Sequence, residues 1–317
     1  MRKSNGCRVF GRRQPWRALV VPPSMDFTVF LVQCLNAVQY GLLLFLVASG
    51  LTLIFGILGV INLAHGSFYM LGAYLAYALA PLVAAYSGGG FFAALGIGIV
   101  LSVAFGYVLE WAFVSYLYER EHLQQVLMTY GLILVFEELR SIALGDDVHG
   151  VAIPRWLSGS VPLGSVMTYP VYRLFMSGVC VAVALGLYAV VTRTRIGMAI
   201  RAGASNREMV QSLGIDIRVL YRIVFAAGVA LAVFAGMIAA PVTSVYPGMG
   251  NQVLIVSFVV VVIGGIGSIR GALLASLVVG FVDTFGNVFI PQIAGILVYV
   301  LMAVILLWRP EGLFRTG

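Results

Sequence analysis

Residues 50–74 have the sequence GLTLIFGILGVINLAHGSFYMLGAY, in which a short polar interruption separates two apolar runs. The interruption begins at Asn62 and ends at Gly66, with His65 inside it. Within a bilayer, non-helical backbone and unpaired polar side chains are tolerated only where protein or a water-filled cavity satisfies them. The pattern therefore predicts a broken membrane helix beside a pathway.

The composition of the whole chain indicates a membrane protein. Apolar residues make up 61% and charged residues 10% of its 317 residues, and the mean hydropathy is +1.03. Soluble domains are about half apolar and about a quarter charged, so a soluble protein is excluded. The long apolar runs predict an all-α polytopic transmembrane helical bundle. At about 20 residues per crossing, the length allows about eight to ten membrane segments.

From Phe27 onward, apolar runs divide the chain into predicted membrane segments. They are 27–49, 50–63, 66–86, 91–117, 123–145, 168–192, 219–241, 251–265, 270–290 and 293–309. Segments 50–63 and 251–265 are short, and a glycine-rich break and a second apolar run follow each of them. We predict that these two broken helices belong to an internal repeat, because interrupted helices at matching positions point to a transport site between repeats.

The charges of the loops predict the orientation. Residues 193–222 hold six arginines against two acidic residues, so the positive-inside rule places them in the cytoplasm. Counting ten crossings outward from there puts 146–167 outside and both termini inside. We attribute the net charge of +7 to cytoplasmic loops of a protein in the cell (inner) membrane, and not to binding of nucleic acid.

Residues 1–24 form a basic stretch before Met25. No apolar core of signal-peptide length follows their arginines before the pair Pro22 and Pro23. Two interpretations stay open, a disordered cytoplasmic tail or a start assigned too early, with translation beginning at Met25. Residues 25–317 are expected to form a single transmembrane domain.

The residue inventory argues against an enzyme. Lys3 is the only lysine, so the chain lacks the lysine with which a P-loop reaches nucleotide phosphates. If ATP drives this protein, another polypeptide supplies the ATPase. The three cysteines are scattered, and no nucleophile–base pair appears. We therefore expect no catalytic residue, no metal site and no cofactor bound by this chain.

Two roles are open for the polar residues of the first break. Asn62 and His65 are three residues apart, so a continuous helix would present them on one face. They either line a translocation path or bond the backbone groups that the break frees. No acidic residue lies near His65 in sequence to orient it as a base, so neither role requires catalysis.

A second break lies in VVVVIGGIGSIRGALLAS, residues 259–276. Gly264, Gly265 and Gly267 resemble a dinucleotide-binding loop only superficially, because that loop needs a soluble βαβ unit. We predict close helix packing through small residues and a backbone break on the translocation path. Arg270 is expected to reach an interface or to face a cavity, because a charge at membrane depth is costly.

The cytoplasmic stretch RTRIGMAIRAGASNREMVQSLGIDI, residues 193–217, has helical periodicity. Ser205 or Asn206 is a candidate N-cap of a second short helix, and Gly214 is a candidate C-cap. An amphipathic segment between membrane spans either lies on the membrane surface or docks on a partner, and both interpretations stay open.

Acidic residues inside apolar runs are functional candidates by default. They are Glu110, Glu137, Glu138 and Asp283. An ion-coupled secondary carrier of a small solute would need such a residue, and Asp283 is the first we would test. Such a carrier is one hypothesis for the function, and it is the alternative to an ATP-driven transport subunit.

Four motifs in order together resemble the permease subunits of branched-chain amino-acid ABC transporters, a family of high-affinity importers of branched-chain amino acids, urea and amides. The motifs are GVINLAHGSFYMLGAY, RTRIGMAIRAGASNREMVQSLGI, VIGGIGSIRGALLAS and the terminal RPEGLF, and the resemblance runs from about Met25 to Phe314. It implies a transport subunit, without its own ATPase site, that forms the path for branched-chain amino acids or for urea, an amide or a related small polar solute.

The resemblance also implies partners and sites. The partners are a second homologous permease subunit, two ABC ATPase subunits that use ATP, and a periplasmic or extracellular solute-binding protein. By matching positions, Asn62, His65 and Gly66 lie near the path. The cytoplasmic coupling segment, 193–218, contacts the ATPase, and its motif positions are Gly197, Arg201, Ala202, Asn206 and Gly214.

Overall fold

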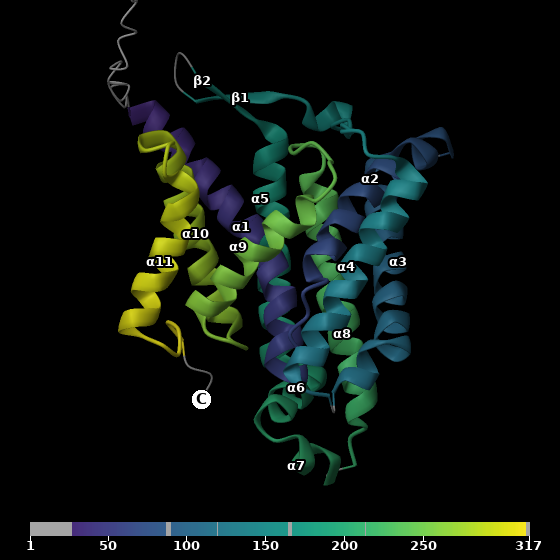
Figure 1. The fold of residues 1–317 in the computed structure, drawn as a ribbon. Coiled ribbons are helices and arrows are strands. Elements are labelled where there is room, and N and C mark those ends of the chain that lie inside the picture. The colour runs from purple at the N-terminus through teal and green to yellow at the C-terminus, as the bar shows by residue number, and fades with distance from the viewer. Residues whose placement is uncertain (1–26, 87–89, 119, 164–166, 213, 315–317) are drawn as a thin grey trace, which may run out of the picture.

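The computed structural model describes residues 27–86, 90–118, 120–163, 167–212 and 214–314, so the predicted tail, 1–24, lies outside the described residues. Over these ranges the chain is a bundle of helices with one small hairpin (Figure 1). The helices are α1 (Phe27–Leu58), α2 (His65–Tyr86), α3 (Gly90–Ala112), η1 (Val114–Leu117), α4 (His122–Leu144), η2 (Arg155–Leu157), α5 (Val171–Arg193), α6 (Arg195–Ser205), α7 (Arg207–Ser212), α8 (Ile217–Ala239), α9 (Met249–Gly264), α10 (Ile269–Phe289) and α11 (Ala294–Trp308). The hairpin pairs β1 (Ser160–Leu163) with β2 (Met167–Pro170) in antiparallel register.

Six helices of the described chain, α1, α2, α3, α5, α8 and α10, are long and apolar enough to cross a membrane. Two more, α9 and α11, are shorter apolar helices. The predicted fold class, an all-α polytopic transmembrane bundle, is confirmed.

One predicted boundary is wrong. The segments 27–49 and 50–63 are a single helix of 32 residues, α1, which ends at Leu58. Gly50 does not interrupt it, because its role is close packing: a Cβ at Gly50 would lie 2.6 Å from the carbonyl oxygen of Gly228 in α8. The chain turns instead at Gly59, whose φ is +67°.

The continuous α1 changes the predicted orientation of the N-terminal part. The start of α1 and the helices α6 and α7 lie at opposite ends of the bundle (Figure 1). The expectation that both ends of the chain lie on the cytoplasmic side is therefore wrong for the start of α1, because one crossing was counted as two.

Small residues let the central helices pack closely. Gly72 of α2 lies against the backbone of Val233 in α8, and a Cβ at Gly106 of α3 would lie 2.9 Å from Cα of Ala226. On the other side of α1, Gly280 of α10 packs against the carbonyl of Ala37. In lipid, where apolar burial gives helices little reason to associate, such close approach is a main source of packing energy.

The loop between α4 and α5 closes the end of the bundle opposite α6 and α7, as predicted for 146–167 (Figure 1). The backbone N–H groups of His149 and Val245 each donate to the other's carbonyl at 2.8 Å. The His149 ring also stacks on Tyr77, with 4.2 Å between the ring centroids. This end therefore ties the α4–α5 loop to the α8–α9 connection.

Candidate functional site

The first break is a non-helical stretch, residues 59–64, between α1 and α2, whose residues are buried or half-buried. Asn62 is 2% exposed and His65, the first residue of α2, is fully buried. His65 Nε2 lies 3.0 Å from the carbonyl oxygen of Val47. Val47 precedes the end of α1 by 11 residues, so the stretch has returned about 16 Å into the bundle. Irregular backbone is tolerable there because protein surrounds it.

Both polar side chains of the break bond backbone groups. Asn62 Oδ1 accepts a hydrogen bond from the N–H of Ala64 at 3.1 Å. His65 carries a proton on Nε2, because the carbonyl of Val47 can only accept. The remaining side-chain nitrogens, Asn62 Nδ2 and His65 Nδ1, are buried without a hydrogen-bond partner among the described residues. The bonding role is thus present, and a role on the path stays a prediction.

Gly66 brings two elements into contact just after the break. Its Cα lies against the carbonyl of Gly250 in α9, and an added Cβ would also lie 2.6 Å from Leu254 Cβ. The first turns of α2 and α9 therefore cross with no room for a side chain.

A cavity of about 300 Å³, here called the outer cavity, lies among α1, α2, α5, α9 and the α8–α9 connection. Val47 and Tyr69 both line it. The bond from His65 fixes the backbone at Val47, and Tyr69 follows His65 by about one turn of α2, so the first break positions two walls of this cavity.

The outer cavity is mostly apolar with several polar groups, and none of its described lining residues is charged. Its polar lining residues are Gln39, Tyr40, Tyr69, Thr243, Tyr246 and Gln252, and the remaining walls are aliphatic residues and methionines. Gln39 Oε1 is buried without a hydrogen-bond partner in the described part of the chain. Sites with apolar walls and a few polar groups suit small molecules that have both kinds of surface.

The polar residues of the outer cavity were not predicted from the sequence. A signal was present, because Gln33, Asn36 and Gln39 recur every three residues in an apolar run and share one face of α1. Asn36 is held from α5, where Arg173 Nη1 donates to its Oδ1 at 2.8 Å. This polar stripe on α1 is therefore a sequence feature that points to the cavity.

The second predicted break is confirmed between α9 and α10. Gly265 and Gly267 have φ of +93° and +81°, values that strongly favour glycine. Ser268 caps α10, accepting a hydrogen bond from the N–H of Gly271 at 3.1 Å. The C-terminal stretch closes the end of α9, because Leu313 N–H donates to the carbonyl of Ile263 at 2.8 Å.

A second cavity, of about 800 Å³ and here called the inner cavity, lies beside this break, among α1, α5 and α6. Gly267 and Arg201 both line it. The structure thus brings together one residue predicted for the path and one predicted for coupling. Gly264 packs against the backbone of Gly271, and Gly265 against the C-terminal stretch, so these two glycines shape the break itself.

The coupling segment forms two short helices that project beyond the bundle (Figure 1). The predicted second helix is confirmed, and Asn206 caps it by accepting from the N–H of Met209 at 3.0 Å. Asn206 N–H also donates to the carbonyl of Ala202 at 2.9 Å. Gly214 turns the chain into α8 with a φ of +81°.

The other two motif positions fasten α6 to the end of α5. Thr194 Oγ1 accepts from the N–H of Gly197 at 3.0 Å, and Arg201 Nη1 donates to the carbonyl of Val191. A Cβ at Gly197 would collide with the carbonyls of Val190 and Val191. The five motif residues therefore set the shape of the coupling segment, and their contact with an ATPase stays a prediction.

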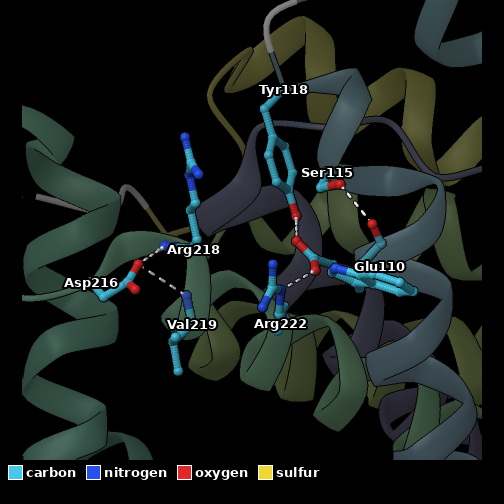
Figure 2. A network of polar contacts seen from close by, with 8 residues as sticks. Glu110, Ser115, Tyr118, Asp216, Arg218, Val219 and Arg222 are labelled. Atoms are coloured by element: carbon cyan, nitrogen blue, oxygen red, sulfur yellow. Dashed lines mark hydrogen bonds and ion pairs between the residues drawn. The ribbon is translucent and has the colours of Figure 1, made fainter.

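Polar contacts link α8, the helix that follows the coupling segment, to α3 (Figure 2). Glu110 is 1% exposed, and its carboxylate accepts from Tyr118 Oη at 2.6 Å and from Arg222 Nε at 3.2 Å. Burial, followed by the bond to Glu110, raises the pKa of the Tyr118 hydroxyl. Arg222 lies on α8, which Asp216 caps at the end of the coupling segment. The sequence predicted Glu110 as a functional candidate, but it did not predict Tyr118 and Arg222 as its hydrogen-bond partners.

Comparisons with known proteins agree with this architecture. The sequence profile of the family described as "Branched-chain amino acid transport system / permease component" matches residues 33–306. The permease protein BraD of a high-affinity branched-chain amino acid transport system of Pseudomonas aeruginosa is 32% identical over 296 residues, which cover 90% of this chain and 95% of BraD.

More distant relatives are similar over the same extent. LivH of Escherichia coli, of the same kind of transport system, is 28% identical over 92% of this chain and 97% of its own length. A probable LivH of Methanocaldococcus jannaschii is 26% identical over 88% of this chain and 90% of its own length. No solved structure matches significantly. From the profile match and the extent of these alignments, the chain belongs to the permease component family of branched-chain amino acid transport systems, as a multi-pass protein of the inner membrane.

Proposed function

We propose that this chain forms the membrane path for branched-chain amino acids, or for a related small polar solute such as urea or an amide. One observation carries the proposal: the two cavities approach each other along α1. Val47 lines the outer cavity and Thr52 the inner cavity, a rise of about 7.5 Å. The residues between them, 48–51, are buried. Two cavities at successive depths of one helix, separated along it by these buried residues, suit a transporter that opens to one side at a time.

The chemistry of the outer cavity supports an uncharged or zwitterionic solute with an apolar part. The buried Gln39 Oε1 is an acceptor available to an ammonium or amide group. The aliphatic residues around it, such as Leu43 and Val256, suit a branched side chain. Urea and small amides use the same polar groups and leave the apolar walls empty, so amino acids fit the cavity better.

The energy source in this proposal is ATP used by separate subunits. Two ABC ATPase subunits bind the coupling segments of this chain and of a second, homologous permease, and a periplasmic or extracellular binding protein delivers the solute. The projecting helices α6 and α7 support this, because they join α5 directly to α8 and Arg201 reaches the inner cavity. Movement of the segment is thereby passed to the path.

The ion-coupled carrier has less support. Asp283 lies on α10. Asn287, one turn later in the same helix, donates to Asp283 Oδ2 at 3.3 Å. It lines neither the outer nor the inner cavity. A coupling acid is expected on the path itself.

Uptake by the complete transporter in proteoliposomes tests the proposal. We expect leucine, isoleucine and valine uptake that requires internal ATP and the ATPase subunits, and loss of uptake in Gln39→Leu. Asp283→Asn is the matched variant off the path and should retain uptake. Transport by this chain alone, driven by an ion gradient and abolished by Asp283→Asn, would favour the carrier instead.

A further inference from the structure

The inner cavity has the features of an anion site. The N-terminus of α10, a helix of 21 residues, borders it at Ser268 and Ile269. First-turn N–H groups and the helix dipole favour negative charge there. Arg270 of α10 and Arg201 of α6 both line the cavity, and none of the described lining residues is acidic. Arg270 Nη2 donates to Tyr188 Oη at 2.8 Å, which holds the guanidinium at the cavity.

A buried hydroxyl supplies independent support. Thr52 lines the cavity, is 1% exposed, and its Oγ1 has no hydrogen-bond partner among the described residues. Several other hydroxyls in the helices bond the carbonyl about one turn back, as Thr129 and Thr192 do. A buried hydroxyl without a partner is rare, and a carboxylate oxygen would satisfy it.

The remaining walls define the rest of the ligand. Leu53, Ile57 and Ile200 give the cavity an aliphatic side next to the arginines and Thr52. We propose that the inner cavity binds the carboxylate of an aliphatic amino acid on the cytoplasmic side, with Thr52 and Arg270 as its side-chain ligands and the N-terminus of α10 beside them. This inference rests on the proposed function, and it names the group by which the solute is held before it leaves.

The test measures binding of L-leucine to the purified complete transporter in the absence of the binding protein. Binding is monitored by the thermal shift of the transporter as leucine is added. Leucinamide, which has the same side chain but no carboxylate, is the comparison ligand. We expect leucine to stabilise the transporter and leucinamide to bind at least about tenfold more weakly. Thr52→Val and Arg270→Gln should each weaken leucine binding by about tenfold, because each removes a hydrogen bond to a charged group.

Matched variants separate the site from general damage. Thr192→Val removes another hydroxyl of the same cavity, one that already donates to the carbonyl of Tyr188 at 2.7 Å. Arg309→Gln removes an arginine just after α11, outside the cavity lining. Both should bind leucine as the unmodified transporter does.

The results that would overturn the carboxylate site differ from those that would overturn the proposed function. Equal binding of leucine and leucinamide overturns the carboxylate site, as does undiminished leucine binding in both Thr52→Val and Arg270→Gln. Leucine uptake measured on the same preparation shows whether the proposed function survives that result. If no branched-chain amino acid is taken up, the proposed function fails for amino acids, and this inference fails with it.

Discussion

Asn62 and His65 show how polar residues at membrane depth are used for structure. A break inside a bundle leaves N–H and C=O groups that water cannot reach, and each unsatisfied group is costly. Asn62 supplies an acceptor within the break, and His65 donates to Val47 of another helix. The sequence predicted that these residues belong to a break. It could not predict the partner Val47, because that bond depends on how far the chain returns into the bundle.

The substitution Gly66→Ala tests how closely α2 and α9 pack just after the first break. Gly66→Ala should destabilise the protein, because a Cβ there meets the carbonyl of Gly250 and Leu254, and overpacking costs about 1–3 kcal/mol. The measurement is the melting temperature in detergent. Gly96→Ala on α3 is the control, since nothing lies within 4 Å of its added Cβ. A melting temperature unchanged by Gly66→Ala would contradict the close crossing of α2 and α9.

Asp146 gives a pH-dependent contact at the outer end. Its hydrogen bond from Arg140 Nη1, at 2.8 Å, lowers the pKa of the Asp146 carboxyl. The contact therefore stabilises the fold fully above the ordinary aspartate pKa of about 4, and the stabilisation is lost as pH falls through the lower pKa of the folded state. We expect the difference in melting temperature between the native protein and Asp146→Asn to disappear on acidification. Asp147→Asn is the control, and an undiminished difference at low pH speaks against the contact.

At the scale of elements, most helices follow from the sequence and their tertiary partners do not. Apolar runs predicted α3, α5 and α8 closely, and glycine and cap residues predicted the second break and the division of the coupling segment. The boundary at Gly50 was wrong, because the sequence shows a glycine in an apolar run and not the carbonyl of Gly228 packed against it. The outer cavity was missed for a related reason: its polar groups come from segments far apart in the chain.

The pair of Glu110 and Arg222 joins α3 to α8 across 112 positions of sequence. Removing one partner leaves the other charge unpaired, so Glu110→Gln and Arg222→Gln should each lower the melting temperature strongly. The double variant should lose less than the sum of the two, with a coupling of about 0.5–3 kcal/mol for groups in direct contact. Tyr118→Phe, which removes only the hydroxyl bond, should cost less than Glu110→Gln. Additive effects of the two single changes would show that the helices are not coupled through this pair.

For the whole molecule, the essential relation is between the coupling segment and the two cavities. The segment leaves α5, which borders both cavities, and enters α8, which borders the outer cavity at Ala239. Arg201 lies on the inner cavity, and Arg222 of α8 reaches Glu110 on α3. Movement of α6 and α7 would therefore act on both sides of the bundle. The sequence predicted the segment and its caps, but its position beside the inner cavity depends on the packing of α1, α5 and the second break.

The substitution Gly214→Ala offers a test of this relation, with Gly145→Ala at the other end of the bundle as its control. Its φ of +81° is unfavourable for alanine, and so is the φ of +77° at Gly145, while a Cβ at either position meets no atom within 4 Å. Both alanine variants should thus carry a backbone strain of about 1 kcal/mol or more. The strain is the larger at Gly145, whose ψ of −176° lies in a region that glycine alone adopts readily. Gly214 lies between α7 and α8, whereas Gly145 lies at the outer end. We expect Gly214→Ala to lower the solute imported per ATP hydrolysed in the complete transporter, and Gly145→Ala to leave this ratio unchanged. Equal ratios in the two variants would mean that the segment does not transmit the ATPase cycle through this turn.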